Sequence, residues 1–360
     1  MNFRNDKPYN DLPLLPPDAS KCETLKIYKE LAEARAVLAE LKGRVSVIPD
    51  PLMLINTLLL QEAKDSLIIE NIITSNDTLF RAFSSSTMKI DGPTKEALRY
   101  REAVLHAYNQ MKTNKTFNDQ LIVNIFKKVT NLDESYREAQ VYIGNQLRVA
   151  YTPPEAGKPL KQKMKNWMDF SNSLNTLDPL IKMAVLHYQF ESIHPFPDGN
   201  GRTGRILNVL FLSKTGLLDL PILYLSKFIL EFKSEYYRLF TEVTESGNWE
   251  DWILYMLKAV KETAKFTLNK VNAIYELYIK TIELVRTEGE GIYSHELIEL
   301  IFKQPYCKIS FVQNANIVSS RNTAGKYLNK LVDMGVLKIE KEGKENLYQN
   351  VELYNILAVG

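Results

Sequence analysis

Residues that could carry out chemistry are concentrated in the segment 194–205, which reads His-Pro-Phe-Pro-Asp-Gly-Asn-Gly-Arg-Thr-Gly-Arg. The helical pattern of residues 206–212 follows, so this loop leads into the amino terminus of a helix. Gly199, Gly201 and Gly204 let a ligand approach the backbone, and the free N–H groups at a helix start favour phosphate. The segment therefore predicts a polyphosphate site.

The charged side chains of the same segment suit that ligand. Arg202 and Arg205 lie three residues apart, so they project from neighbouring positions and can hold different oxygens of a triphosphate-sized anion. Asp198 is a hard oxygen ligand of the kind that Mg²⁺ takes together with phosphate and water. His194 has an ordinary pKa near neutrality and can accept a proton from an attacking hydroxyl. We expect a general base at His194 and a metal ligand at Asp198.

A second interpretation of the glycines is a dinucleotide-binding fingerprint. The three glycines match its spacing, and Asp219 falls twenty residues after Gly199, where a ribose-binding acid is sought. That fingerprint needs a strand directly before the glycines and a βαβ unit, whereas the flanks here have helical patterns. A P-loop would need Lys and then Ser or Thr where this chain has Arg205 and Ile206. The helical flanks favour the first interpretation.

The segment matches the motif HxFx[DE]GNGRxxR at every defined position, and the chain resembles bacterial Fic proteins with an appended winged helix. The proline-rich start, the flap before the motif and the helix YLSKFILEFKSEYYRLF after it extend the resemblance. It implies a protein adenylyltransferase that uses ATP and Mg²⁺. By that resemblance, His194 deprotonates a Tyr, Thr or Ser hydroxyl of a target protein or of the chain itself. The hydroxyl attacks the α-phosphate, and pyrophosphate leaves.

The resemblance also implies roles for individual residues. Asp198 would hold Mg²⁺ against the α and β phosphates, Asn200 would join the anion hole, and Tyr237 would form a wall of the adenosine site. The implied ATP-binding residues are Gly199, Asn200, Gly201, Arg202, Thr203, Gly204, Arg205 and Tyr237. The implied flap, residues 140–155, would align the target's backbone by strand addition. The flap residues expected to dock the target are Ile143, Gly144 and Tyr151.

Upstream, residues 66–71 read Ser-Leu-Ile-Ile-Glu-Asn and match the family's inhibitory-helix motif [ST]xxxE[GN], which Asn71 completes. Ser66 and Glu70 share one helix face because they are four residues apart. The resemblance implies that Glu70 pairs with Arg205 and blocks the γ-phosphate, so that the enzyme is autoinhibited. Some family members use the same glutamate to position water and remove AMP, so a reverse reaction stays open.

Helical patterns cover most of the chain, and we expect a mainly α fold. The segments are 21–42, 54–73, 95–112, 118–132, 162–174, 180–190, 226–246 and a long stretch, 249–284, expected to bend or break. Residues 140–151 instead alternate apolar and polar side chains around Gly144-Asn145, which predicts a small hairpin. The predicted domains are residues 1–110, with the inhibitory helix at about 54–73, and a Fic core, residues 111–284.

A winged helix-turn-helix is predicted for residues 285–360. Its helical patterns start near residues 294, 311 and 320, and its strands cover 337–340 and 345–349 with a turn at 342–344. This module allows an alternative function, a DNA-binding regulator with a nucleotide-sensing Fic-like domain. The basic residues of the recognition helix are Arg321, Lys326 and Lys330, and glutamates at 340, 342 and 345 surround the wing. DNA binding therefore stays open.

The composition limits the remaining function classes. A net charge of +2 over 360 residues gives no overall electrostatic footprint for nucleic acid or an anionic membrane. Cys22 and Cys307 lie too far apart in sequence for a disulfide framework or a CxxC motif, and a reducing cytoplasm fits. The start carries charges and prolines, and the apolar region 206–230 is interrupted by charges, so we expect neither a signal peptide nor a membrane span. A homodimer is expected because oligomers are common in such proteins.

Overall fold

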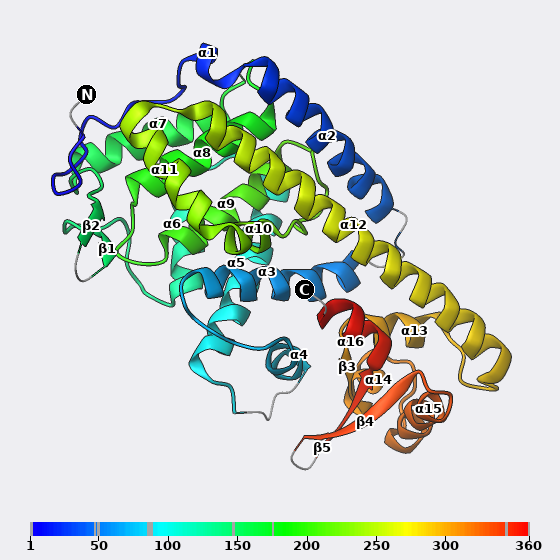
Figure 1. The fold of residues 1–360 in the computed structure, drawn as a ribbon. Helices are drawn as coiled ribbons and strands as arrows, with labels where there is room; N and C mark the ends of the chain where they lie inside the picture. Colours follow the sequence, from blue (N-terminus) through cyan, green and yellow to red (C-terminus); the bar gives the residue numbers. More distant parts are fainter. Residues whose placement is uncertain are drawn as a thin grey trace.

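The computed structural model describes residues 3–46, 48, 51–84, 89–145, 148–174, 176–342 and 345–358. Within these ranges the chain forms sixteen helices and two small antiparallel sheets. A large helical body carries a smaller mixed module at one end (Figure 1). The mainly α fold with a small hairpin and a carboxyl-terminal module is confirmed.

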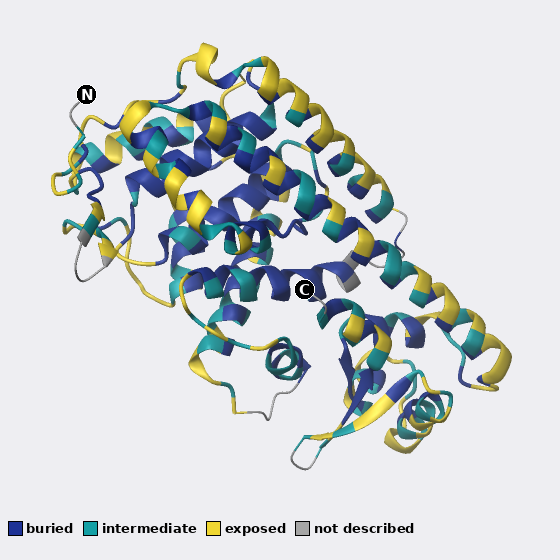
Figure 2. Ribbon diagram, in the orientation of Figure 1, coloured by how far each residue is buried: buried dark blue, intermediate teal, exposed yellow. Residues whose placement is uncertain are grey.

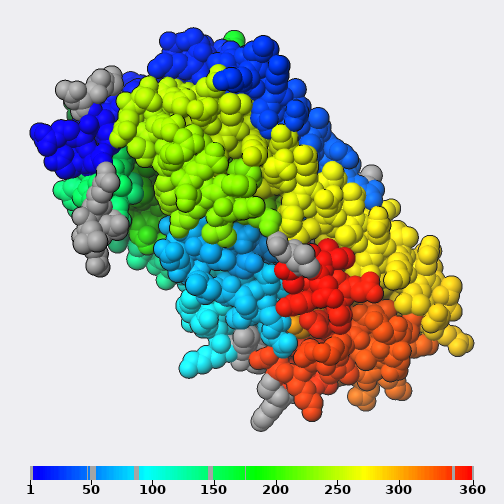
Figure 3. Space-filling model, in the orientation of Figure 1, coloured from blue at the N-terminus to red at the C-terminus, as the bar shows by residue number. Residues whose placement is uncertain are grey.

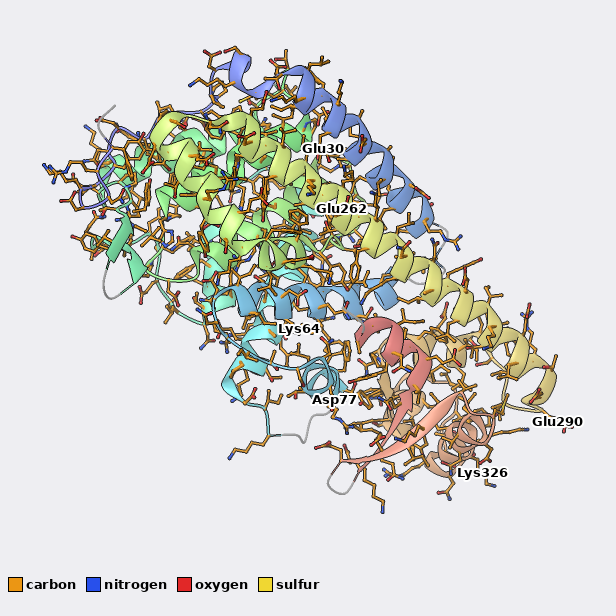
Figure 4. All side chains as sticks on the ribbon, in the orientation of Figure 1. Glu30, Lys64, Asp77, Glu262, Glu290 and Lys326 are labelled. Carbon is orange, nitrogen blue, oxygen red and sulfur yellow. The ribbon has the colours of Figure 1, made fainter. Side chains whose placement is uncertain are left out.

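The amino-terminal helices are attached directly to the body. They are α1 (Ala19–Cys22), α2 (Leu25–Val45), α3 (Pro51–Ile69), α4 (Asn76–Ser84), α5 (Gly92–Thr113) and α6 (Asp119–Thr130). Helix α2 lies alongside α12 (Trp249–Glu288) (Figure 1). The Lys261 ammonium of α12 lies 2.5 Å from the carboxylate of Glu30, which Figure 4 marks on α2. Helices of the predicted 1–110 region therefore pack on the predicted core.

The centre of the body is formed by helices that are buried on nearly every side. The remaining helices of the body are α7 (Lys158–Asn172), α8 (Pro179–Ile193), α9 (Asn200–Lys214), α10 (Leu225–Glu231) and α11 (Lys233–Ser246). Every residue of α8 from Leu180 to Ile193 is buried, and Figure 2 shows α8 and α9 in dark blue. A helix that is surrounded in this way forms the core that other helices cover. The site segment 194–205 connects these two central helices.

Two helical predictions need correction. The segment 226–246 is not one helix, because the chain breaks at Phe232 into α10 and α11. The stretch expected to bend or break is instead the continuous helix α12, which runs for 40 residues. None of the helices in the described ranges is both long enough and apolar enough to cross a lipid bilayer.

The expected hairpin consists of β1 (Ile143–Asn145) and β2 (Arg148–Tyr151), paired antiparallel with a register shift after Ile143. Gly144 and Asn145 pair with Val149 and Arg148, so they belong to the first strand and not to the turn. The turn itself, residues 146 and 147, lies outside the described residues.

The described part of the carboxyl-terminal module has four helices and a three-stranded sheet. Its elements are α13 (His295–Phe302), β3 (Tyr306–Cys307), α14 (Ile309–Asn314), α15 (Arg321–Asp333), β4 (Leu337–Glu342), β5 (Glu345–Asn350) and α16 (Val351–Ala358). The strand order is β3-β5-β4. The three helices and the wing follow the predicted order, whereas β3 and α16 were not predicted. Residues 343 and 344 of the expected turn lie outside the described residues.

Candidate active site

The site loop is held rigidly between α8 and α9. Its aromatic residue, Phe196, is fully buried and stacks on Phe126 of α6 at a centroid distance of 4.2 Å. The Asn200 carboxamide accepts from the Phe196 N–H and donates to the Phe196 carbonyl, both at 2.8 Å. These bonds hold the buried side chain of Asn200 against the loop, and its backbone N–H lies in the first turn of α9.

His194 occupies the junction between α8 and the loop in a conformation suited to a base. It caps α8 with left-handed backbone angles, φ 49° and ψ 60°, and donates its N–H to the Phe190 carbonyl at 3.0 Å. Its Nδ1 lies 3.3 Å from the carbonyl oxygen of Glu191. A carbonyl only accepts, so Nδ1 carries the proton and Nε2 keeps its lone pair. Burial lowers the pKa of His194 to about 4, so the ring is neutral at pH 7.

Arg137 holds the backbone of His194 in place, and no local sequence pattern marked this residue. Its guanidinium donates to the carbonyls of His194 at 2.9 Å, Ala139 at 3.2 Å and Ile193 at 3.5 Å, and also to that of Pro154. Arg137 is 4% exposed, and its bonds join the end of α8 to both ends of the flap segment. A buried arginine that satisfies backbone carbonyls in this way positions the chain at His194.

Arg205, the second arginine of the motif, is bound by the segment that carries Ser66 and Glu70. Its Nε donates to the Ser66 hydroxyl at 2.8 Å, and its Nη2 donates to the Ser66 carbonyl and to Glu70 Oε1, both at 2.9 Å. Arg205 is 4% exposed. Although burial opposes ionisation of Glu70, the Arg205 guanidinium brings the pKa of that carboxyl below its ordinary value. Glu70 and Arg205 therefore form an ion pair.

The helix that was predicted to be inhibitory ends earlier than the predicted residue 73, because α3 ends at Ile69. Asn71 adopts the left-handed conformation, with φ 62°, and donates its N–H to the Ile68 carbonyl at 3.0 Å. The Ile72 N–H reaches back to the Leu67 carbonyl at 3.0 Å. This is a Schellman cap, in which Gly or Asn is favoured at the left-handed position. Glu70 is therefore the capping residue, and the cap turns the chain away just after it.

The Glu70 carboxylate covers the start of α9. A Cβ atom built on Gly201 would lie 2.5 Å from Glu70 Oε1 and 2.9 Å from Arg205 Nη1. The amino terminus of a helix attracts anions through its free N–H groups and its dipole. The carboxylate thus occupies the region in which a phosphate would be bound.

Arg202 is also paired with carboxylates. It forms ion pairs with Glu96 of α5 and with Asp198, the latter at 3.2 Å. The side chain of Asp198 is 70% exposed, and its Oδ1 accepts the Gly199 N–H at 2.6 Å. Glu96 was not predicted, since nothing in its own segment marks a contact with residue 202.

A magnesium ion would have to share its ligands with a bound nucleotide. The described residues contain no cluster of three or more His, Cys, Asp or Glu side chains suited to a metal. Mg²⁺ commonly binds through one or two carboxylates together with phosphate oxygens and water. The exposed carboxylate of Asp198 beside the start of α9 fits that arrangement.

Glu191 is a buried acid that was not predicted from the sequence. Its Oε1 has no hydrogen-bond partner among the described residues, and a Cβ built on Gly204 would lie 2.2 Å from it. Burial raises the pKa of Glu191 to about 8. Gly204 therefore allows α9 to pack against α8, and Thr203 is also fully buried. Neither the Thr203 side chain nor the side of Gly204 on which a Cβ atom would lie faces open space.

Tyr237 and the flap were predicted to contact the nucleotide and the target. Tyr237 is 49% exposed, and burial together with the negative charge of Glu70 raises the pKa of its hydroxyl. Tyr151 is buried and donates to the Ser192 carbonyl at 2.9 Å, so its side chain anchors the flap to α8. Ile143 is half-buried and Gly144 is exposed. Any pairing with a target backbone would use the main chain of this hairpin.

The fold and the site together define a helical protein in which a carboxylate of its own chain covers the start of a central helix. Two Fic/DOC models match, the family's N-terminal model over residues 28–109 and the family model over residues 110–212, which together cover more than half of the chain. A third model, for the C-terminal domain of SoFic-like protein adenylyltransferases, matches residues 277–353. The chain belongs to the Fic/DOC family.

Several curated relatives are similar in sequence. A protein adenylyltransferase Fic of Drosophila grimshawi is 30% identical over 158 residues, which are 43% of this chain and 29% of the relative. A probable protein adenylyltransferase of Aquifex aeolicus is 27% identical over 237 residues, which are 63% of this chain and 65% of the relative. The chain thus spans less than two thirds of the length of these relatives.

Solved structures share the fold. A Fic family protein from Desulfovibrio desulfuricans G20 has a TM-score of 0.56 and 20% identity, with 93% of this chain and 98% of that chain covered. Fic-1 from C. elegans has a TM-score of 0.54 and 21% identity, with 69% and 74% covered. At these identities the likeness concerns the arrangement of the helices.

Proposed function

We propose that the protein is a protein adenylyltransferase that transfers AMP from ATP to a Tyr, Thr or Ser hydroxyl of a target protein or of itself. The observation that carries the proposal is the placement of a neutral histidine at one end of the loop 194–200 and two arginines on the helix at the other end. This arrangement supports a general base at His194 and a triphosphate site at the start of α9.

In the proposed reaction, the hydroxyl oxygen of the target attacks the α-phosphorus while its proton passes to Nε2 of His194. A new oxygen–phosphorus bond forms, the bond between the α-phosphorus and the bridging oxygen to the β-phosphate breaks, and pyrophosphate leaves. The N–H groups in the first turn of α9 bind the α-phosphate oxygens, and Arg202 and Arg205 bind the outer phosphates. Asp198 would hold Mg²⁺, which would neutralise phosphate charge.

We further propose that Glu70 keeps this enzyme inhibited. The carboxylate pairs with Arg205 and lies beside Gly201, so it competes with phosphate for both the arginine and the helix start. ATP in its productive position would need Glu70 to move away. Removal of the carboxylate should therefore activate the enzyme.

The experiment compares ATP labelled on the α-phosphate with ATP labelled on the γ-phosphate. In the presence of Mg²⁺ and cell lysate, Glu70→Gly should transfer the α-label to protein and leave the γ-label in pyrophosphate. Glu231→Gly, which changes an exposed glutamate at the end of α10, is the matched control and should behave like the unmodified protein. Transfer of the γ-label would instead indicate a kinase-type reaction, and transfer of neither label would remove the proposal.

A reverse reaction can be tested with the same material. Protein labelled with AMP by Glu70→Gly is purified and incubated with the unmodified enzyme. Loss of AMP that requires Glu70 would assign the carboxylate a second role, that of positioning water. If the protein keeps its AMP label, the role of Glu70 is limited to inhibition.

A further inference from the structure

The carboxyl-terminal module contacts the inhibitory segment through α4, the helix that follows Glu70 in the chain. In the space-filling view, the blue region of α3 and α4 lies against the red and orange carboxyl-terminal module (Figure 3). Figure 4 marks Asp77 on α4 at this contact, whereas Lys326 of α15 lies at the outer end of the module. The wing strand β4 is therefore engaged by another part of the same chain.

An arginine of α4 is bound by an acidic and aromatic edge of the module. The Arg81 guanidinium pairs with Glu342 at 3.3 Å and with Glu340 at 3.7 Å, both on β4. It also lies 4.9 Å from the centroid of the Tyr306 ring, on β3. Within α4, Asp77 accepts from Arg81 at 2.7 Å, and its other oxygen accepts from the Tyr306 hydroxyl at 2.5 Å. The module thus supplies two carboxylates and the face of an aromatic ring to the guanidinium of Arg81.

The end of α16 adds an apolar contact and a capping bond to the same interface. Phe80 of α4 is 1% exposed and packs edge-to-face on Tyr354 of α16 at 5.9 Å. Asn76, the first residue of α4, donates its side-chain amide to the Ala358 carbonyl at 3.2 Å. The carbonyls at a helix end lack intrahelical partners, so this bond satisfies one of them.

A second connection joins the module to α3 itself. Lys270 of α12 is buried and donates to Gln61 Oε1 of α3 at 3.1 Å and to the Leu357 carbonyl of α16 at 2.9 Å. The end of α16 is thus bound to α4 directly and to the inhibitory helix through one lysine.

The chain between Glu70 and α4 is short and attached. Only residues 71–75 separate Glu70 from Asn76. Thr74 shares a hydrogen bond of 2.9 Å with Thr94 of α5, and Ser75 caps α4 by accepting the Thr78 N–H at 3.0 Å. A segment held at both ends restricts the movement of the residue that precedes it. Glu70 can leave Arg205 more readily when α4 is free to move.

We propose that the acidic and aromatic edge formed by Tyr306, Glu340 and Glu342 is a docking surface for this chain's own α4, and that docking of α4 holds Glu70 on Arg205. The inhibitory part rests on the proposed transferase function, whereas the docking itself does not. Release of α4 from the module would then be the event that activates the enzyme.

The test changes the docking surface from both sides and leaves Glu70 intact. The variants are Arg81→Ala on α4 and the double variant Glu340→Gln with Glu342→Gln on β4. Each should raise AMP transfer by about 5- to 150-fold, the usual range of coupling between two sites. Tyr306→Phe, which removes one hydrogen bond and keeps the ring, should give a smaller rise. Arg35→Ala is the matched control, because Arg35 on α2 pairs with Asp178, the residue that caps the start of α8, and neither residue belongs to α4 or the module.

Amide hydrogen exchange provides a readout that does not depend on catalysis. The docking variants should exchange faster over residues 71–84 than the unmodified protein and Arg35→Ala do. By thermodynamic reciprocity, saturating Mg²⁺-ATP should also speed exchange of the same residues in the unmodified protein, since nucleotide displaces Glu70. A thermal melt of each variant shows whether the rest of the fold is retained.

Each outcome has a defined meaning. Unchanged exchange in both the α4 and the β4 variants would overturn the docking surface, and faster exchange without a rise in transfer would overturn its link to Glu70. A docking variant that raises transfer further in a Glu70→Gly background would act by another route and would also overturn the link. If Glu70→Gly itself transfers no AMP, the proposed function fails, while the exchange measurement still decides whether α4 docks.

Discussion

The buried carboxyl of Glu191 should make the stability of the protein depend on pH in a way that one substitution removes. Burial raises its pKa to about 8 in the folded protein, from an ordinary value of 4.5. The unfolded chain therefore loses this proton near pH 4.5, whereas the folded protein keeps it until about pH 8. Stability from this group is fully present below pH 4.5 and is lost as the pH rises toward 8. The slope is about 1.4 kcal/mol per pH unit between those limits.

The assay is urea unfolding of the unmodified protein and of Glu191→Gln at pH 5, 6 and 7, followed by fluorescence of the three tryptophans. Glutamine has the shape of the neutral acid and does not ionise, so the variant should resemble the unmodified protein at pH 5. At pH 7 the free energy of unfolding of the variant should exceed that of the unmodified protein by about 2 to 3 kcal/mol, relative to the difference at pH 5. The difference between the two free energies of unfolding removes the effect of groups that both proteins share. One of these is Glu62, because burial also raises its pKa to about 8. If the free energies of unfolding of the two proteins change in parallel from pH 5 to pH 7, the reasoning is refuted.

Further predictions concern the residues around His194 and α9. Arg137→Ala in a Glu70→Gly background should lower kcat with little change in the KM for ATP, because it frees the backbone of His194. It should also move the acid limb of the pH–rate profile to higher pH, since the Arg137 charge helps to lower the pKa of His194; an unmoved limb would mean a purely structural role. Gly204→Ala should destabilise the fold by about 1 to 3 kcal/mol in urea unfolding, because the new Cβ would collide with the Glu191 carboxyl. An unchanged midpoint would show that α8 and α9 separate easily.

The helical content and the site loop could be read from the sequence because both depend on local patterns. Apolar periodicity marked the main helices of the body, and a glycine-rich loop before the helical run 206–212 marked the start of α9. The end of α3 could not be read in this way. The apolar run continues to residue 73, whereas the left-handed turn at Asn71 ends the helix at Ile69.

The missed residues act across long distances in the sequence. Arg137 meets carbonyls more than fifty residues away, at Ile193 and His194, and Glu96 meets Arg202 from another helix. No periodicity or local spacing records such contacts. Glu191 stands near the end of α8, where every residue is buried, and the glycine that faces it from α9 leaves room for its carboxyl. These positions follow from how the helices pack, which a single sequence does not specify.

The most direct test of the account is the mass of the intact protein after incubation with Mg²⁺-ATP. It compares the unmodified protein, Glu70→Gly, and Glu70→Gly combined with His194→Ala. The account predicts that only Glu70→Gly, on itself or on an added target, gains the mass of AMP. An equal gain in the double variant would contradict the role of His194, and an equal gain in the unmodified protein would contradict inhibition by Glu70.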